Sequence, residues 1–200
     1  MQLYNKLSKK ERLDLINKAG EKRLTLSFYK YSKIKNTFIF RNFLFVHLER
    51  LNVLGRIYIA SEGINAQLSV PGSKLIEFKN LIDSISFLNG VRLNIAIKHS
   101  NEAFLKLKVK IKEKIVADGL NLNDYDLDVH GKHVNAKEFN ELLEDKNTIT
   151  IDMRNHYESE VGHFKGANLP DVDTFRESLP LIKNKYESYK KNRKILMYCT

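Results

Sequence analysis

Between residues 23 and 98 the spacing of the apolar residues alternates between the two-residue period of a strand and the 3.6-residue period of a helix. The first strand begins at Arg23, where Leu24, Leu26 and Phe28 alternate with polar residues. A helix, two strands, a second helix and a last strand are then expected at residues 38–51, 55–60, 64–70, 75–85 and 91–97. This order predicts a four-stranded antiparallel sheet with two helices on one face, because a split βαβ arrangement packs its elements in that way.

Such an architecture is ferredoxin-like, or acylphosphatase-like, and we expect it to form an α+β domain over residues 23–117. Residues 1–22 are expected to form a helical extension, in which Ser8 caps a helix that ends near Gly20. Many ferredoxin-like domains bind RNA, but the fold alone does not establish this function.

Four aromatic residues lie on or just after the predicted strands: Phe28, Tyr29, Tyr31 and Tyr58. We expect these rings to pack in the core. The alternative is base stacking, as in RNA-recognition motifs, although the signature sequence of those motifs is absent.

Lysines alternate with mainly apolar residues between Phe104 and Ile115, which predicts a strand with one lysine face. These lysines are Lys106, Lys108, Lys110, Lys112 and Lys114. They either protect a solvated edge strand from aggregation or form a ridge that binds the phosphates of RNA.

The formal net charge of +10 comes entirely from residues 1–100, which hold 17 Lys and Arg against 7 Asp and Glu. Base-composition bias or a polyanionic partner would each explain this excess. The 200 residues contain no apolar run long enough to span a bilayer and no signal peptide, so we expect a cytoplasmic protein without membrane association. A single cysteine excludes an internal disulfide.

Residues 118–144 are rich in acids, including Asp124, Asp126 and Asp128, and are expected to form an acidic linker. The second domain is then expected at residues 145–200. Its apolar strands, at residues 149–154 and 194–199, flank a glycine-bracketed turn at residues 162–167. Cys199 lies at the carboxyl end of the last strand, where parallel α/β sheets build their sites.

Several motifs of this half together resemble the rhodanese domain, which implies a parallel-sheet α/β fold: Asp152-Met153-Arg154, Tyr157-Glu158, Gly162-His163-Phe164 and Tyr198-Cys199. Longer stretches are similar to one rhodanese-containing family, the oxygen-dependent tRNA uridine(34) hydroxylases, at residues 151–158, 173–176 and 197–200. The similarity extends into the first half at residues 27–31, 61–67 and 114–119. Members of this family form 5-hydroxyuridine at anticodon position 34, so the resemblance implies a tRNA-modifying oxidoreductase with tRNA as its partner.

The resemblance also implies roles for individual residues. Cys199 would be the catalytic residue. One possible reaction would proceed through a persulfide on its sulfur. Asp152 and Arg154 would form a buried pair beside the active loop, which Glu158 and His163 would help to hold. The alternatives are structural: a loop tied down by these four residues, and a cysteine buried at a strand end.

Rhodanese active loops run Cys-x-x-Gly-x-Arg into a helix, whereas this chain stops at Thr200. We therefore expect an incomplete rhodanese-like domain, either a fragment of a longer enzyme or a shortened product. The implied co-substrate is O2, but the sequence contains no flavin motif and no two-His-one-carboxylate set, so it assigns neither a cofactor nor a metal. A rhodanese-type sulfurtransferase and a non-catalytic RNA-binding module are the alternative functions, and the oligomeric state is not predicted.

Overall fold

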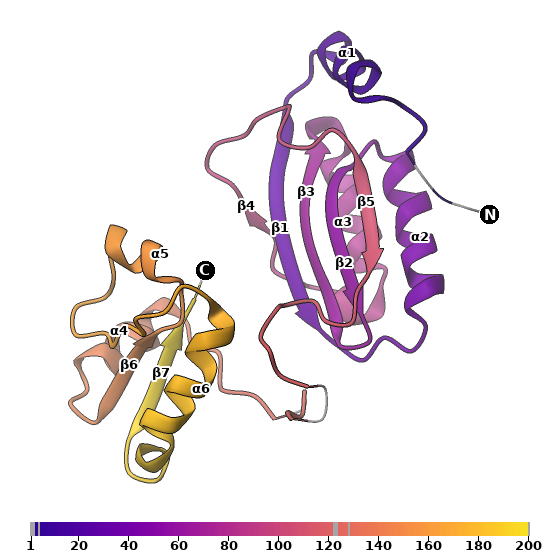
Figure 1. Cartoon of the computed structure of the whole chain (residues 1–200). Helices are drawn as coiled ribbons and strands as arrows, with labels where there is room; N and C mark the ends of the chain where they lie inside the picture. The colour runs from indigo at the N-terminus through magenta and orange to yellow at the C-terminus, as the bar shows by residue number, and fades with distance from the viewer. Residues whose placement is uncertain (1–2, 4, 122–123, 128, 200) are drawn as a thin grey trace. The chain divides into compact units, whose positions relative to one another are not determined.

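The computed structural model describes residues 3, 5–121, 124–127 and 129–199, so Asp128 and Thr200 lie outside the described residues. The chain forms two compact units, one ending at Val116 and the other beginning at Ala117 (Figure 1). Each unit has its own sheet. Among the described residues, no helix is long and apolar enough to cross a membrane.

The first unit is built on a five-stranded sheet with the order β4-β1-β3-β2-β5. Its strands are β1 (Arg23–Tyr31), β2 (Leu54–Ala60), β3 (Gly63–Pro71), β4 (Asn94–Ile95) and β5 (Leu107–Ile111). Its helices are α1 (Lys9–Ala19), α2 (Thr37–Arg50) and α3 (Leu75–Asp83), with short 3-10 turns at Gly72–Lys74 and Ser86–Leu88. From β1 to β4 the elements follow the predicted β-α-β-β-α-β order, with antiparallel pairing between neighbouring strands.

The sheet differs from the predicted one at both edges. At one edge, β4 contains only Asn94–Ile95 of the strand expected at residues 91–97. At the other edge, β5 adds a fifth strand that pairs in parallel with β2. The predicted lysine strand is shortened to Leu107–Ile111 because β2 offers no partner beyond Ala60, and the last bond runs from the Lys112 N–H to the Ile59 carbonyl.

Helices α2 and α3 cover one face of this sheet (Figure 1). Leu44 and Phe78, from the two helices, are fully buried against sheet residues such as Ile64. Burial of these apolar side chains provides the main stabilisation of the unit. Helix α1 precedes the sheet and begins at the predicted cap, since Glu11 N–H donates to Ser8 Oγ at 3.2 Å.

The aromatic residues of β1 divide between the two faces. Phe28 is buried in the core, as expected. Tyr29 and Tyr31 are 55% and 38% exposed, so the expectation that they pack in the core is wrong. Alternation along a strand places Tyr29 on the opposite face from Phe28, away from the helices.

The second unit contains a two-stranded parallel sheet of β6 (Thr148–Asp152) and β7 (Lys194–Tyr198). Its helices are α4 (Ala136–Glu144), α5 (His156–Val161) and α6 (Phe175–Tyr186), followed by a 3-10 turn at Glu187–Lys191. Helix α4 lies within the segment expected as a linker and packs against both strands. The buried apolar cluster is small and consists of Ile149, Ile151, Met153, Ile182 and Tyr186.

Candidate active site

The carboxyl ends of β6 and β7 bring together the residues singled out in the second half of the sequence. Asp152 is the last residue of β6 and is fully buried. It lies in register with Tyr198, the last residue of β7, and Cys199 follows directly. Parallel pairing therefore places the aspartate and the cysteine at the same end of the sheet.

Arg154 and Asp152 form a two-point ion pair. The Arg154 Nε lies 2.9 Å from Asp152 Oδ1, and Nη2 lies 2.6 Å from Oδ2. The Arg154 backbone N–H also donates to Oδ1 at 3.0 Å, while Nη2 donates to the Gly162 carbonyl at 2.6 Å. This ion pair ties the loop after α5 to the end of β6.

Tyr198 completes this cluster, although the motifs of the sequence assign it no role of its own. Its hydroxyl donates to Asp152 Oδ2 at 2.8 Å and accepts from the Phe164 N–H at 3.3 Å. The Arg154 guanidinium carbon lies 5.4 Å from the centre of the Tyr198 ring. The ring also packs edge-on against Phe164, with 4.9 Å between centroids. In the sequence, the sign of its importance is its place directly before the candidate cysteine. Its partner can be identified only when the register of β6 and β7 is known.

The ionisation of the cluster follows from these contacts. Burial alone would raise the pKa of Asp152, but hydrogen bonds from the side chain and backbone of Arg154 and from Tyr198 outweigh it and hold the pKa below its ordinary value. The bond to Asp152 raises the pKa of Arg154, so the guanidinium remains charged. Burial and the bond to Asp152 raise the pKa of Tyr198, so its hydroxyl remains a donor at neutral pH.

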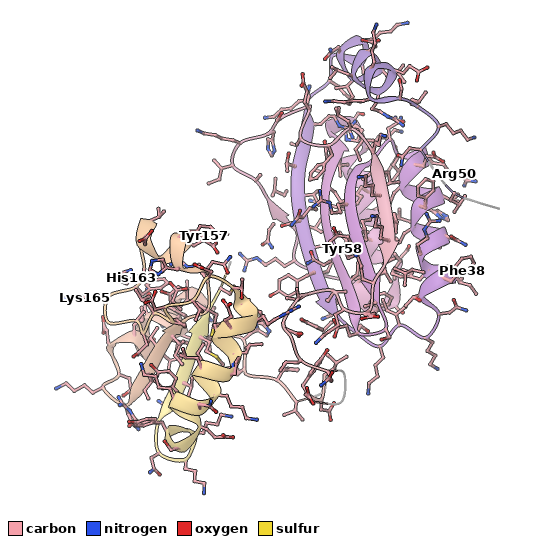
Figure 2. The ribbon with its side chains drawn as sticks, viewed as in Figure 1. Phe38, Arg50, Tyr58, Tyr157, His163 and Lys165 are labelled. Carbon is pink, nitrogen blue, oxygen red and sulfur yellow. The ribbon has the colours of Figure 1, made fainter. Side chains whose placement is uncertain are left out.

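Glu158 and His163 make polar contacts at the ends of helix α5. Glu158 accepts a hydrogen bond from the Asn155 N–H at 3.2 Å in a capping box. The Nδ1 of His163 lies 3.0 Å from the Ser159 carbonyl oxygen; Figure 2 labels His163 beside α5. These contacts order the segment that contains Gly162, whose carbonyl oxygen accepts a hydrogen bond from Arg154.

Cys199 lies at the surface, next to the buried cluster. Its side chain is exposed, with Sγ 3.8 Å from the Met153 carbonyl oxygen. The Met153 N–H donates to the Tyr198 carbonyl at 2.8 Å and so continues the strand pairing up to the cysteine.

Within residues 3, 5–121, 124–127 and 129–199, no group of three His, Cys, Asp or Glu side chains is arranged to hold a metal ion. The ring centroids of His130 and His133 lie 6.5 Å apart.

The five predicted RNA-binding lysines lie in the first unit, at the β5 edge. Only Lys108 and Lys110 belong to the strand, and both are exposed. Lys106 and Lys112 are exposed on either side of β5, whereas Lys114 is half-buried. Ile111, expected on the apolar side, is also exposed, so the regular lysine face ends there.

The comparisons with known proteins agree in both halves of the chain. Residues 23–115 match the family described as the UPF0176 acylphosphatase-like domain. The chain is 48% identical, over 99% of its length, to the tRNA uridine(34) hydroxylase of Leptospira interrogans. Over the same share it is 43% identical to the protein of that name from Enterobacter sp. strain 638 and 41% identical to the one from Yersinia pestis.

Over nearly its whole length, this chain is similar to proteins named tRNA uridine(34) hydroxylase. The resemblance inferred from its motifs is confirmed, as is the acylphosphatase-like character of the first domain. The chain spans 53% of the Leptospira protein and 57% of the Enterobacter protein, a little over half of each.

Proposed function

We propose that this chain is the tRNA-binding and cysteine-bearing part of an oxidoreductase that hydroxylates C5 of uridine at anticodon position 34, with O2 as co-substrate. The identity of 48% over 99% of the chain carries this proposal. Such a role places the protein in the cytoplasm, where its tRNA substrate is found.

In this proposal the second unit is a rhodanese-like domain and Cys199 is the catalytic residue. Its support is the parallel pair β6 and β7, whose carboxyl ends present an exposed thiol beside a buried ion pair. Sites in parallel sheets form at this end, and a cysteine thiolate there can act as a nucleophile.

Asp152, Arg154 and Tyr198 are positioning residues in this scheme. Because the Arg154 guanidinium is paired with Asp152, Arg154 acts on Cys199 by holding the backbone near the cysteine. Tyr198 carries that constraint into β7, one residue before the thiol. The cluster therefore fixes where the sulfur lies.

Replacement of the thiol tests the proposal. Cells expressing Cys199→Ser should contain tRNA without 5-hydroxyuridine, measured by mass spectrometry of digested tRNA, while the purified variant still binds tRNA. Met197→Leu, at an exposed position two residues earlier, is the matched control and should leave modification unchanged. Full modification by Cys199→Ser would overturn the catalytic assignment.

The β5 lysines are proposed to bind the phosphates of the tRNA. Replacing Lys106, Lys108 and Lys110 with alanine should weaken binding and lower the slope of log affinity against log salt, by about 0.7 to 0.9 for each phosphate that a lysine no longer neutralises. Three exposed lysines of the second unit, Lys183, Lys185 and Lys190, provide a charge-matched control. An unchanged salt slope would support the alternative of a lysine-protected edge strand.

The exposed thiol also favours a second candidate, a rhodanese-type sulfurtransferase. The Cys199 thiolate would then attack the outer sulfur of thiosulfate, break its S–S bond and release sulfite. The resulting persulfide would be detectable by mass spectrometry and absent from Cys199→Ser. If the protein encoded by the complete gene forms no persulfide, the sulfurtransferase is excluded.

A further inference from the structure

The face of the first sheet that lies away from α2 and α3 carries a continuous row of polar side chains. Strand register places Ser27 of β1 opposite Gln67 of β3 and Asn94 of β4. On the other side, Gln67 is opposite Arg56 of β2, which is opposite Lys108 of β5. The row therefore crosses all five strands and becomes basic towards β5.

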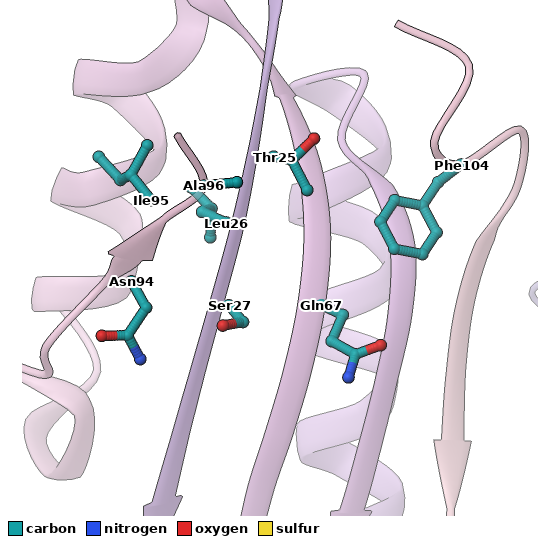
Figure 3. A pocket seen from close by; sticks show the side chains of 8 residues that line it. All are labelled: Thr25, Leu26, Ser27, Gln67, Asn94, Ile95, Ala96 and Phe104. Atoms are coloured by element: carbon teal, nitrogen blue, oxygen red, sulfur yellow. The ribbon is translucent and has the colours of Figure 1, made fainter. Parts of the chain in front are cut away.

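A hollow lies at the β4 end of this row. It has a volume of about 340 Å³. Its lining combines two side-chain amides, two hydroxyls and one aromatic ring with three apolar residues: Asn94, Gln67, Thr25, Ser27, Phe104, Leu26, Ile95 and Ala96. Figure 3 shows Ser27 and Gln67 on adjacent strands, with the Phe104 ring beside them.

We propose that this hollow binds one unstacked base of a single-stranded RNA, with the RNA backbone following the row towards β5. A base has a flat π face and an edge of donors and acceptors. Phe104 offers a ring for stacking, and each of the Gln67 and Asn94 amides offers both a donor and an acceptor. The surface that lines the hollow is mainly apolar, which suits the flat face of a base, while the two amides can contact the polar edge of that base.

The charge of the sheet favours a polyanion. Its five strands contain no Asp or Glu. On the helix-free face, Arg56 and Lys108 follow Gln67 in register, where they can contact the phosphates next to the bound base. RNA sites that combine cations with stacking rings bind single strands in this way.

Tyr29 provides a place for a neighbouring base. It lies two residues beyond Ser27 on β1, on the same face, and its side chain is 55% exposed. Because the row crosses the strands, Tyr29 lies beside the path of the RNA backbone, where a base that turns to that side can stack on its ring. Tyr58, labelled in Figure 2, lies in the adjacent row opposite Lys110 and is half-buried, with the Lys112 ammonium 5.7 Å from its ring centre.

The inference rests on the proposed function and deepens it, because it adds a base-binding site to the unit whose β5 lysines are proposed to bind tRNA phosphates. The site does not depend on chemistry at Cys199. Its test is therefore a binding measurement. Fluorescein-labelled octamer RNA and a matched octamer with abasic sites are titrated with the full chain, and affinity is measured by anisotropy. The wild-type protein should bind the octamer with bases at least about fivefold more tightly, since stacking contributes roughly 1–3 kcal/mol per base.

Variants locate the site. Phe104→Ala and Gln67→Leu should reduce the preference for the octamer with bases at least about threefold, whereas Phe104→Tyr should retain it because the ring remains. Phe38→Ala removes a phenylalanine that is 63% exposed on α2 and serves as the matched control; Figure 2 labels this residue. Circular dichroism checks that each variant is folded.

Equal affinity for the two octamers, or the same loss in Phe38→Ala as in Phe104→Ala, would overturn the inference. Binding of uridine monophosphate alone, without measurable binding of the octamer, would also overturn it by indicating a nucleotide site. If Cys199→Ser retains tRNA modification but Phe104→Ala loses base preference, the proposed catalytic role fails and the base-binding site stands.

Discussion

The two units of this chain are stabilised by different kinds of interaction. The first buries a continuous apolar core between its sheet and two helices, with Leu44, Ile64 and Phe78 completely enclosed. The second encloses a small apolar cluster and, beside it, the carboxylate of Asp152. Apolar burial is insensitive to ionisation, whereas the polar cluster requires Asp152 and Arg154 to remain charged.

This difference affects how the candidate active site can be studied. In the first unit, the proposed RNA contacts lie on the exposed face of the sheet, so they can be replaced without disturbing the core. In the second, Asp152, Arg154 and Tyr198 are proposed to position Cys199, and their mutual contacts also stabilise the unit. A decrease in activity in a variant of this cluster therefore has to be measured together with the stability of the unit.

The largest expected effect is the loss of an aromatic ring from the first core. Phe78→Ala should lower the free energy of unfolding of the first unit by about 3–5 kcal/mol, because it removes a fully buried ring and leaves a cavity. Hydrogen exchange should rise in peptides from β1, β2 and β3 but not in those from β6 and β7. The control, Ile76→Ala, truncates a residue that is 74% exposed on the same helix and should cost less than about 0.5 kcal/mol.

A smaller effect, confined to the second unit, is expected when its buried carboxylate is neutralised. Asp152→Asn should destabilise the second unit by roughly 2–3 kcal/mol, since Arg154 loses its charged partner. Exchange should then rise in peptides from β6 and β7 alone. The control is Asp171→Asn, whose carboxylate is 94% exposed. Equal destabilisation by both variants would contradict the importance of the buried pair.

Acid should reduce the difference between the wild type and Asp152→Asn. The pKa of Asp152 is lower in the folded state, so its stabilisation is present above the unfolded pKa, about 3.9. It is lost as the pH falls from there through the folded pKa. Urea unfolding of the second unit, followed from pH 7 to pH 2.5, should therefore show the two proteins converging below about pH 4. A constant difference would mean that the charge of Asp152 does not stabilise the unit.

Local patterns predicted most elements of the fold. The strand beginning at Arg23, the helix capped by Ser8 and the strand beginning at Lys194 follow from apolar spacing and capping chemistry, which depend on neighbouring residues. Pairing at the sheet edges could not be predicted in the same way. The partner of β5 is β2, some fifty residues earlier, and only the tertiary structure shows that their pairing stops at Ile111.

The site was predicted to a similar extent. Motifs identified Asp152 and Arg154, which the structure brings together. They did not identify Tyr198 as their partner, because that contact depends on the register of two strands more than forty residues apart.

Tyr198→Phe isolates the contact that sequence reasoning missed, and its effect should be the smallest. The change keeps the ring but removes the hydroxyl that binds Asp152 and Phe164, so the second unit should lose about 1 kcal/mol of stability at neutral pH. The pKa of Tyr198 is raised in the folded state, so the contribution of its protonation is present below the unfolded pKa, about 10. It is lost as the pH rises through the folded pKa. Urea unfolding at pH 7 and at pH 11 should therefore show a smaller difference between the two proteins at pH 11, and Tyr157→Phe, whose ring is 64% exposed, should match the wild type at both. If Tyr198→Phe is as stable as the wild type at pH 7, backbone pairing is enough to hold β7 against β6, and the hydroxyl is dispensable for the proposed positioning of Cys199.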